Sequence, residues 1–363
     1  MDAILGKPTK GIPSWLINPM EHTVIDRLAG KPLGTYRQAP VPTYLAMQKA
    51  IGTGMVDQWI PENPLSMGAE GYSADTHRTA TMGVEEIICD GIRIDSPEAV
   101  IEHLEKFVFP YLENATVDAD AHVRSLITAE AAVQTVLAPE ILKVPYGVVE
   151  FPYLPYYTYG YTNFFMAYAL YPEVMERLFA RQADRAVRIN RAVARAYVEG
   201  GLPPLCRLDH DIADSRGTLV DVTSLDRIWF PHFARAIEPL LKANVRLIWH
   251  CDGNLMAMVP RLLAVGLGGF QGFQYEDGMD YEKICALKTR DGAPLLIIAG
   301  VSVTRTLPFG TPADVRKEMQ WLVEHGPATG LFLGGSSSIA PGVPWDNLVA
   351  LVEGFRYYRE HGR

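Results

Sequence analysis

The sequence predicts a parallel α/β fold and, within that class, a single (β/α)₈ barrel with an N-terminal helical extension. Short apolar runs alternate with amphipathic helical segments, as expected of parallel strands buried on both faces. The chain has 363 residues, 48% of them hydrophobic, which is enough for one large domain. The alternative is an open doubly wound sheet, but the sequence lacks the G-x-G-x-x-G and G-x-x-x-x-G-K-[ST] motifs of its nucleotide-binding forms.

The C-terminal third shows the alternation most plainly, as four units of a strand followed by a helix. Thr311 is a plausible N-cap with Pro312 at the first helical position, and Gly326 is a plausible C-cap. The expected strands are 245–249, 268–273, 294–300 and 330–335, and the expected helices are 254–266, 280–292, 311–326 and 344–362.

The middle of the chain continues the same pattern. Helices are expected at 98–112, 171–201 and 226–244, and strands at 146–157 and 202–211. The first 95 residues are rich in Pro and Gly and are expected to form a helical prelude plus the first strand. Because no linker or low-complexity tract interrupts the pattern, residues 1–363 are expected to form one domain.

Composition narrows the class of protein. The net charge is −9 and no dense Lys/Arg cluster occurs, which argues against nucleic acid or an anionic membrane surface as a partner. The four cysteines, at positions 89, 206, 251 and 285, form no CxxC pair, so a disulfide framework is not expected. No apolar stretch reaches 18 residues, and the first residues do not resemble a signal peptide. We therefore expect a cytoplasmic protein, with a homodimer left open.

Polar residues collect where the expected strands end. In a parallel α/β fold functional groups lie at the carboxyl ends of strands, so these residues are expected to line one mouth. The groups are Asp209, His210 and Asp211; His250, Cys251 and Asp252; Gln274 to Asp277; and Ser336 to Ser338.

The segment 250–252 carries the strongest candidates. His250 and Asp252 point the same way if the strand geometry persists, and Cys251 points the other way. That pairing suits a divalent metal or acid/base chemistry. Ordinary roles compete with these: a histidine bonded to a backbone carbonyl, a buried apolar cysteine, and turn or capping roles for Asp252 and Asp211.

The segment 151–173 is unusually rich in aromatic residues. Five tyrosines precede Asn163, and Pro155 and Gly160 favour a loop over the mouth. Tyrosines there would form a flat wall suited to an aromatic ligand. Packing of Phe164, Phe165 and Tyr168 on a helix face is the competing interpretation.

Several segments resemble the uroporphyrinogen decarboxylase superfamily, and are closer to its cobalamin-dependent methyltransferase branch, such as the methyltransferase I of O-demethylases. They are "GYTNFFMAYALYPEVMERLF", "DHDIADSRGTLVDVTSLDRIWFPHFARAI", "IWHCDGNLMAMVPRLLAVGLGGFQGFQYEDGMD" and "IAGVSVTRTLPFGTPADVRKEMQWLVEHG". The ending "GVPWDNLVALVEGF" is similar to the superfamily's "TPxEN". The resemblance covers roughly residues 150–360 and implies a (β/α)₈ barrel.

Two departures from the family patterns narrow this resemblance. The decarboxylases carry "RQAGRY" near the N-terminus, whereas this chain reads "IPSWLINPMEHTVIDR", which argues against a porphyrin with many carboxylates. The thiol methyltransferases hold zinc through H-x-C and a distant Cys, whereas this chain has Asp252 at the second position and no Cys after the last strand. What remains resembles the branch that moves a methyl group from a donor such as a phenyl methyl ether to a corrinoid protein.

The resemblance implies roles for particular residues. His250, Asp252 and Asp211 are the expected catalytic residues, and His250, Asp252 and Cys251 the expected ligands of a zinc ion. Tyr156, Tyr159, Asn163, His210 and Glu276 are expected to contact a small methyl donor, and cobalamin is expected to come from a corrinoid protein partner. Two alternatives stay open: decarboxylation of a non-porphyrin acid, and a barrel that binds an aromatic ligand without catalysis.

Overall fold

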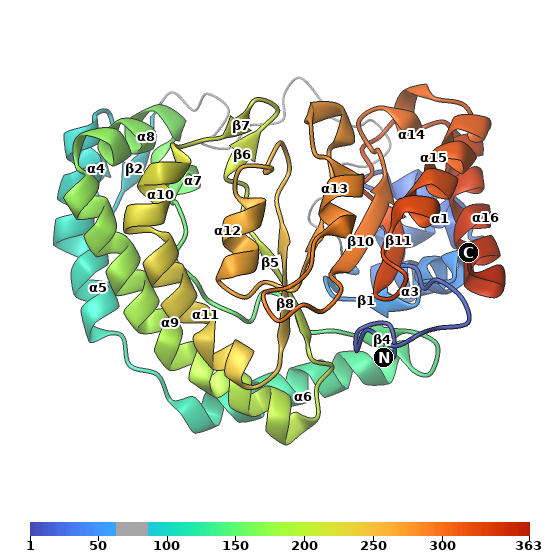
Figure 1. Cartoon of the computed structure of the whole chain (residues 1–363), viewed down its shortest axis with the longest axis horizontal. Helices are drawn as coiled ribbons and strands as arrows, with labels where there is room; N and C mark the ends of the chain where they lie inside the picture. Colours follow the sequence, from blue (N-terminus) through green and yellow to red (C-terminus); the bar gives the residue numbers. More distant parts are fainter. Residues whose placement is uncertain (63–85) are drawn as a thin grey trace.

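The computed structural model describes residues 1–62 and 86–363. Its centre is a parallel sheet of five strands in the order β11–β10–β9–β8–β5 (Figure 1). The strands are β5 (Leu205–Asp209), β8 (Arg246–His250), β9 (Gly269–Gln271), β10 (Leu296–Val301) and β11 (Leu331–Gly335). Neighbouring strands are all paired in parallel, which confirms the predicted parallel α/β class.

Further short segments pair in parallel beyond this sheet. β1 (Met55–Val56) pairs with β4 (Leu142–Lys143). Isolated parallel bridges join Ser14 to Leu333 of β11, Trp15 to Met55 of β1, and Tyr146 to Arg207 of β5. The regular sheet has five strands, so strand assignment alone does not establish the closed eight-stranded barrel expected from the sequence.

Helices flank the sheet. Figure 1 shows α9 and α11 to one side of the strands and α15 and α16 to the other. The helices before β5 are α1 (His22–Leu28), α2 (Thr35–Gln38), α3 (Pro40–Ile51), α4 (Pro97–His103), the π-helix η2 (Leu104–Val108), α5 (Phe109–Asn114), α6 (Ala119–Leu137), α7 (Tyr156–Tyr159), α8 (Tyr161–Leu170) and α9 (Pro172–Gly200). Those after it are α10 (Val222–Ile228), α11 (Phe230–Lys242), α12 (Val259–Ala264), the 3₁₀ turn η3 (Tyr275–Asp277), α13 (Tyr281–Ala286), α14 (Thr306–Phe309), α15 (Pro312–His325) and α16 (Trp345–His361).

Local sequence accounts for the helix limits that matter most. α15 begins at a capping box, in which Thr311 and Asp314 satisfy each other's backbone N–H groups, so the predicted N-cap is confirmed. α9 has Pro172 in its first turn and ends at Gly201, whose φ of 59° is the left-handed conformation that glycine adopts readily. All four C-terminal strand–helix units lie where the sequence predicts them.

Two hydrophobic clusters cover the two faces of the sheet. Alternate residues along β8 and β10 belong to different clusters, with Leu247 and Ile297 in the larger one and Ile248 and Ile298 in the smaller. The larger cluster packs the sheet against the helices. The smaller gathers side chains from the N-terminal segment, β1, 141–144, β5, β8, β10 and β11. Burial on both faces explains why the central residues of β8 and β10 are apolar.

Three sequence predictions are wrong. The segment 146–157 is not a strand: only Tyr146 makes a parallel bridge, and α7 begins at Tyr156. The aromatic segment is not a loop, because α7 and α8 include most of it and Tyr156, Tyr159 and Phe164 are buried. The helix expected at 226–244 is divided into α10 and α11 at Trp229.

Two small antiparallel ribbons complete the described chain. They are β2 (Ile88–Cys89) with β3 (Ile92–Arg93), and β6 (Ala213–Asp214) with β7 (Gly217–Thr218). The β6–β7 ribbon follows directly on β5, at the edge of the sheet where the strands end (Figure 1). None of the described helices combines the length and the apolar character needed to cross a membrane.

Candidate functional site

Two aspartates and a histidine meet where β5 and β8 end. The strands are parallel neighbours, and their register pairs Asp209 with His250. One potential ligand atom from each of Asp209, Asp211 and His250 lies within 4.8 Å of the other two. In the part of the chain that the structure describes, this is the one group of three or more such residues that is arranged to hold a metal ion. We call these three residues, with Asp252, the carboxylate–histidine cluster.

His250 is buried, and no hydrogen bond to its ring is found among the described residues. Its Nε2 lies 3.9 Å from Oδ1 of Asp209 and 3.9 Å from Oδ1 of Asp252, which is too far for a hydrogen bond. Among the described residues its buried Nδ1 has no hydrogen-bond partner, and it lies beside Gly272, where a Cβ atom would come within 2.5 Å. Since buried polar atoms are normally paired, this imidazole indicates a place for a ligand.

Asp209 is held on the side away from His250. Its Oδ2 accepts hydrogen bonds from Nη1 of Arg207 at 2.9 Å and from the hydroxyl of Tyr146 at 2.8 Å. Burial by itself raises the pKa of Asp209, but the charges of His250 and Arg207 and the two hydrogen bonds outweigh it and lower the pKa. Asp209 is therefore an ionised carboxylate whose Oδ1 faces the imidazole.

Arg207 links Asp209 to a second buried carboxylate. Its Nε donates to Oδ2 of Asp57 at 2.7 Å, while Oδ1 of Asp57 accepts from the indole of Trp15 at 2.9 Å. The guanidinium lies over the rings of Trp15 and Tyr146, at 5.2 Å and 4.5 Å from their centroids. Its side chain is 4% exposed, so this ion pair is screened little by water.

Asp211 and Asp252 crowd the other side of the cluster. The backbone N–H of Asp252 donates to Oδ1 of Asp211 at 2.8 Å, and Oδ1 of Asp252 is buried with no partner among the described residues. Burial is the largest cause that raises the pKa of Asp211, and the charges of Asp252 and Asp209 add to it, against the lowering effect of His250. Carboxylates placed so close together repel one another unless a cation lies between them.

The donor set fits a divalent cation. Around Asp57, Asp209, Asp211 and Asp252 the one permanent positive charge that makes an ion pair is Arg207, among the described residues. A tetrahedral zinc ion with bonds of about 2.0–2.1 Å holds its ligand atoms roughly 3.3 Å apart. Nε2 of His250 lies 3.9 Å from a carboxylate oxygen of Asp209 and of Asp252, and the ligand atoms of Asp209, Asp211 and His250 lie within 4.8 Å of one another, so they would move inward to bind such an ion.

Cys251 stands apart from this donor set. Its Sγ accepts a hydrogen bond from the N–H of Ile212 at 3.4 Å and donates to the carbonyl of Asp252 at 3.0 Å. Burial raises the pKa of its thiol well above the ordinary value, so the thiolate that a zinc ion requires is disfavoured. Of the three ligands expected from the sequence, His250 belongs to the group Asp209, Asp211 and His250, Asp252 lies beside it, and the sulfur of Cys251 has other partners.

Tyr156, Tyr159 and Asn163, which the sequence predicts to contact substrate, each make contacts within the protein. Tyr156 is fully buried, donates its hydroxyl to the carbonyl of Asp211 and stacks near His210 with ring centroids 5.9 Å apart. The hydroxyl of Tyr159 lies 2.8 Å from Nδ1 of His103. Asn163 donates to the carbonyl of Ile94 at 2.9 Å. Tyr156 thus fixes the backbone of Asp211 through a hydrogen bond, while Tyr159 and Asn163 contact other segments.

His210 and Glu276 are also engaged. Nε2 of His210 accepts the N–H of Leu154 at 3.0 Å, and burial lowers the pKa of His210 to about 4, so its ring is neutral. Oε1 of Glu276 accepts from the hydroxyls of Ser302, at 2.7 Å, and Thr304.

Sequence reasoning missed Asp57, Arg207 and Tyr146. Arg207 and Asp209 share a face because they are two residues apart on β5, which is a readable signal. Asp57 gives no such signal, since it precedes its partner Arg207 by 150 residues.

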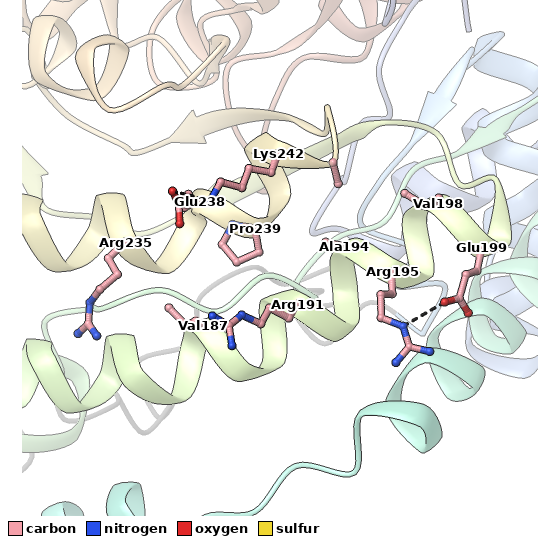
Figure 2. Close-up of a pocket in the computed structure, with 11 residues that line it drawn as sticks. Val187, Arg191, Ala194, Arg195, Val198, Glu199, Arg235, Glu238, Pro239 and Lys242 are labelled. Atoms are coloured by element: carbon pink, nitrogen blue, oxygen red, sulfur yellow. Dashed lines mark hydrogen bonds and ion pairs between the residues drawn. The ribbon is translucent and has the colours of Figure 1, made fainter.

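An open cleft of about 760 Å³ adjoins the cluster. Asp209 and His210 contribute to its wall, together with residues of η2, α5, the 149–157 segment and α9. A second hollow of about 620 Å³ lies on the outer surface between α9 and α11 (Figure 2). Its charged groups pair locally, as Arg195 does with Glu199 and Lys242 with Glu238. It lies near the ends of α9 and α11 that lead into β5 and β8, opposite the edge that carries the cluster.

The fold and these side chains define an α/β protein with a candidate metal centre at the carboxyl edge of its parallel sheet. No protein-family model matches the chain, and no curated protein matches it. A solved structure with some similarity is a B12-independent methionine synthase from Shewanella sp. W3-18-1 in complex with selenomethionine. The identity is 12% and the TM-score 0.41, over 65% of this chain and 67% of that chain. This likeness is too distant to assign a family or an activity.

Proposed function

We propose that the carboxylate–histidine cluster binds a divalent metal ion, with zinc as the first candidate, and that the protein is a methyltransferase. The observation that carries the proposal is the meeting of Asp209, Asp211 and the unpaired imidazole of His250 within 4.8 Å at the end of β5 and β8. One nitrogen and two or three oxygens are ligands that zinc accepts, and three protein ligands leave a position for a substrate.

The reaction follows from the sequence resemblance together with this centre. The donor is a small aromatic methyl ether, and the acceptor is the Co(I) of a corrinoid protein. The methyl–oxygen bond breaks with its electron pair on oxygen, while Co(I) supplies the pair that forms the new carbon–cobalt bond. A bound metal would supply Lewis acidity at that oxygen, because phenolate is a poor leaving group.

Several side chains position the proposed metal ligands. Arg207 and Tyr146 fix Asp209 as an ionised carboxylate directed at His250. Gly272 leaves room for the imidazole. Asp252 and Asp211 complete an anionic pocket that attracts a cation. If no metal is bound, His250 has the proposed role of the acid that protonates the leaving oxygen.

The proposed architecture is a single (β/α)₈ barrel, in which the isolated bridges close the ring. The parallel pairings lead from β11 through 14–15 to β1, from β1 to β4, and from Tyr146 to β5. The smaller hydrophobic cluster, which takes side chains from nearly every member of this ring, supports it as the interior of a barrel. The cluster then lies at the carboxyl mouth, where a corrin could approach.

The test mixes purified protein, an aromatic methyl ether and a reduced corrinoid protein, and follows corrinoid methylation by absorbance. We expect methylation only when all three are present, and a rate at least about 100-fold lower for His250→Ala. Release of carbon dioxide from a carboxylated substrate by the protein alone would favour a decarboxylase. Binding of the ether without any turnover would favour a non-catalytic receptor.

A further inference from the structure

Four aromatic side chains are exposed around one cleft. Phe107 is 40% exposed, Tyr111 60%, Tyr153 48% and Tyr157 51%. All four line the cleft of about 760 Å³ beside the cluster. Large aromatic side chains are usually buried, and their exposure together on a concave surface marks a binding site. The volume falls within the range of roughly 300–1,000 Å³ that small-molecule sites occupy.

The aromatic side chains come from two different parts of the fold. Phe107 and Tyr111 lie on η2 and α5, whereas Tyr153 and Tyr157 lie on the segment that leads into α7 and on α7 itself. The cleft is lined by both groups, so a ligand within it meets aromatic rings from separate elements. Flat, rigid side chains of this kind favour a flat ligand, because aromatic pairs gain from offset-stacked or edge-to-face contact.

Most polar groups of the cleft already have a partner inside the cleft or behind its wall. Arg185 forms an ion pair with Glu150, and Asp90 lies 2.8 Å from His103. Gln182, which is 8% exposed, accepts the N–H of Tyr153 at 3.0 Å. Away from Asp209, which faces the candidate metal centre, the charged groups of the lining are matched, so this part of the cleft favours an uncharged ligand.

The cleft adjoins the candidate metal centre at Asp209. Asp209 belongs to its wall, and Oδ1 of the same carboxylate faces His250. His210, also in the wall, lies edge-on to Tyr153 with ring centroids 6.3 Å apart. A ligand that occupies the cleft can thus present one end to Asp209.

We propose that this cleft holds the aromatic body of the substrate, an uncharged ring of about benzene size, with its reacting end at Asp209. Phe107, Tyr111, Tyr153 and Tyr157 determine the preference for a planar ring, in place of Tyr156, Tyr159 and Asn163. The inference rests on the proposed function for the identity of the ligand as substrate, but the preference for aromatic over saturated rings is a property of the cleft itself.

The test measures binding to the full chain by calorimetry, without corrinoid, for methoxybenzene and for cyclohexyl methyl ether. The two probes share the ether group and differ in the aromaticity of the ring. We expect methoxybenzene to bind at least about tenfold more tightly, and the double variant Tyr153→Leu/Tyr157→Leu to lose that preference. The matched control is Tyr357→Leu, a tyrosine that is 56% exposed on α16 and outside the cleft, which should keep it.

Equal binding of the two probes by the unaltered protein would overturn the inference, as would an unchanged preference in the double variant. Because both tyrosines are about half exposed, circular dichroism should show all variants folded. If the double variant kept both the methylation of the corrinoid and the ring preference, the role of the cleft would be rejected and the proposed function would stand. A ring preference that depends on them, in a protein that transfers no methyl group, would support the cleft and reject the function.

Discussion

Replacing Arg207 with Met tests the buried charges that orient Asp209. The guanidinium makes one charged hydrogen bond to Asp57 at 2.7 Å and one to Asp209 at 2.9 Å. Removing it leaves both carboxylates without this partner, and Asp57 is 2% exposed. Removing one partner of a buried ion pair costs about 3–5 kcal/mol, so the free energy of unfolding should fall by that amount.

The assay is equilibrium unfolding in urea, with Asp57→Asn and the double variant Asp57→Asn/Arg207→Met alongside. The double variant should be more stable than the sum of the two single losses predicts, because it removes the uncompensated charge of Asp57. A second measurement is the affinity for Zn²⁺, which should fall roughly 10- to 100-fold because Arg207 orients a metal ligand. A loss below about 1 kcal/mol, typical of an exposed pair, together with unchanged zinc affinity, would refute this reasoning.

Three further predictions follow from the same contacts. His210 stays neutral when folded and has a pKa of about 4 against an ordinary 6.5, so stability should be lost as the pH falls from 6.5 towards 4, by about 3 kcal/mol. His210→Gln should remove that dependence; an unchanged profile contradicts it. Gly272→Ala places a Cβ within 2.5 Å of His250 at a φ of 77°. It should lower the free energy of unfolding by about 1–3 kcal/mol and weaken zinc binding. Unchanged zinc affinity would show that this prediction is wrong. Asp252→Asn relieves repulsion of Asp211 and should stabilise the metal-free protein but not the zinc-loaded one; equal effects on both would contradict the crowding of carboxylates.

The sequence predicts the C-terminal half of the fold well because its strands are buried on both faces. Each of β8, β10 and β11 is an apolar run followed by an amphipathic helix, and that periodicity is visible without tertiary information. β1 and β4 are two residues each and leave almost no periodic signal. Their pairing depends on contacts between segments far apart in the chain.

The candidate site was predictable in part. Strand ends pointed to Asp209, Asp211, His250 and Asp252, and the structure brings them together because β5 and β8 are parallel neighbours in register. The alternation of side chains along an extended segment also predicts that Cys251 points away from His250 and Asp252, and its sulfur contacts Ile212 and the carbonyl of Asp252.

The sequence does not predict which aromatic side chains of the 151–173 segment are buried. The segment's high tyrosine content is visible in the sequence, but composition does not distinguish a ring that packs inward from one that faces a cleft. Tyr156 is fully buried, whereas its neighbour Tyr157 is half exposed. That difference depends on the helical turn of α7, which places adjacent residues on different sides.

The metal centre is tested most directly by titrating chelator-treated protein with Zn²⁺ in competition with a chromophoric chelator. The account predicts one equivalent of tightly bound zinc, with affinity reduced at least about 100-fold in His250→Ala and in Asp209→Asn. Cys251→Ala is the matched control from the same strand end and should bind as the unaltered protein does, because its sulfur is engaged with Ile212 and Asp252. Equal zinc affinity in His250→Ala and the unaltered protein, or loss of zinc in Cys251→Ala alone, would contradict it.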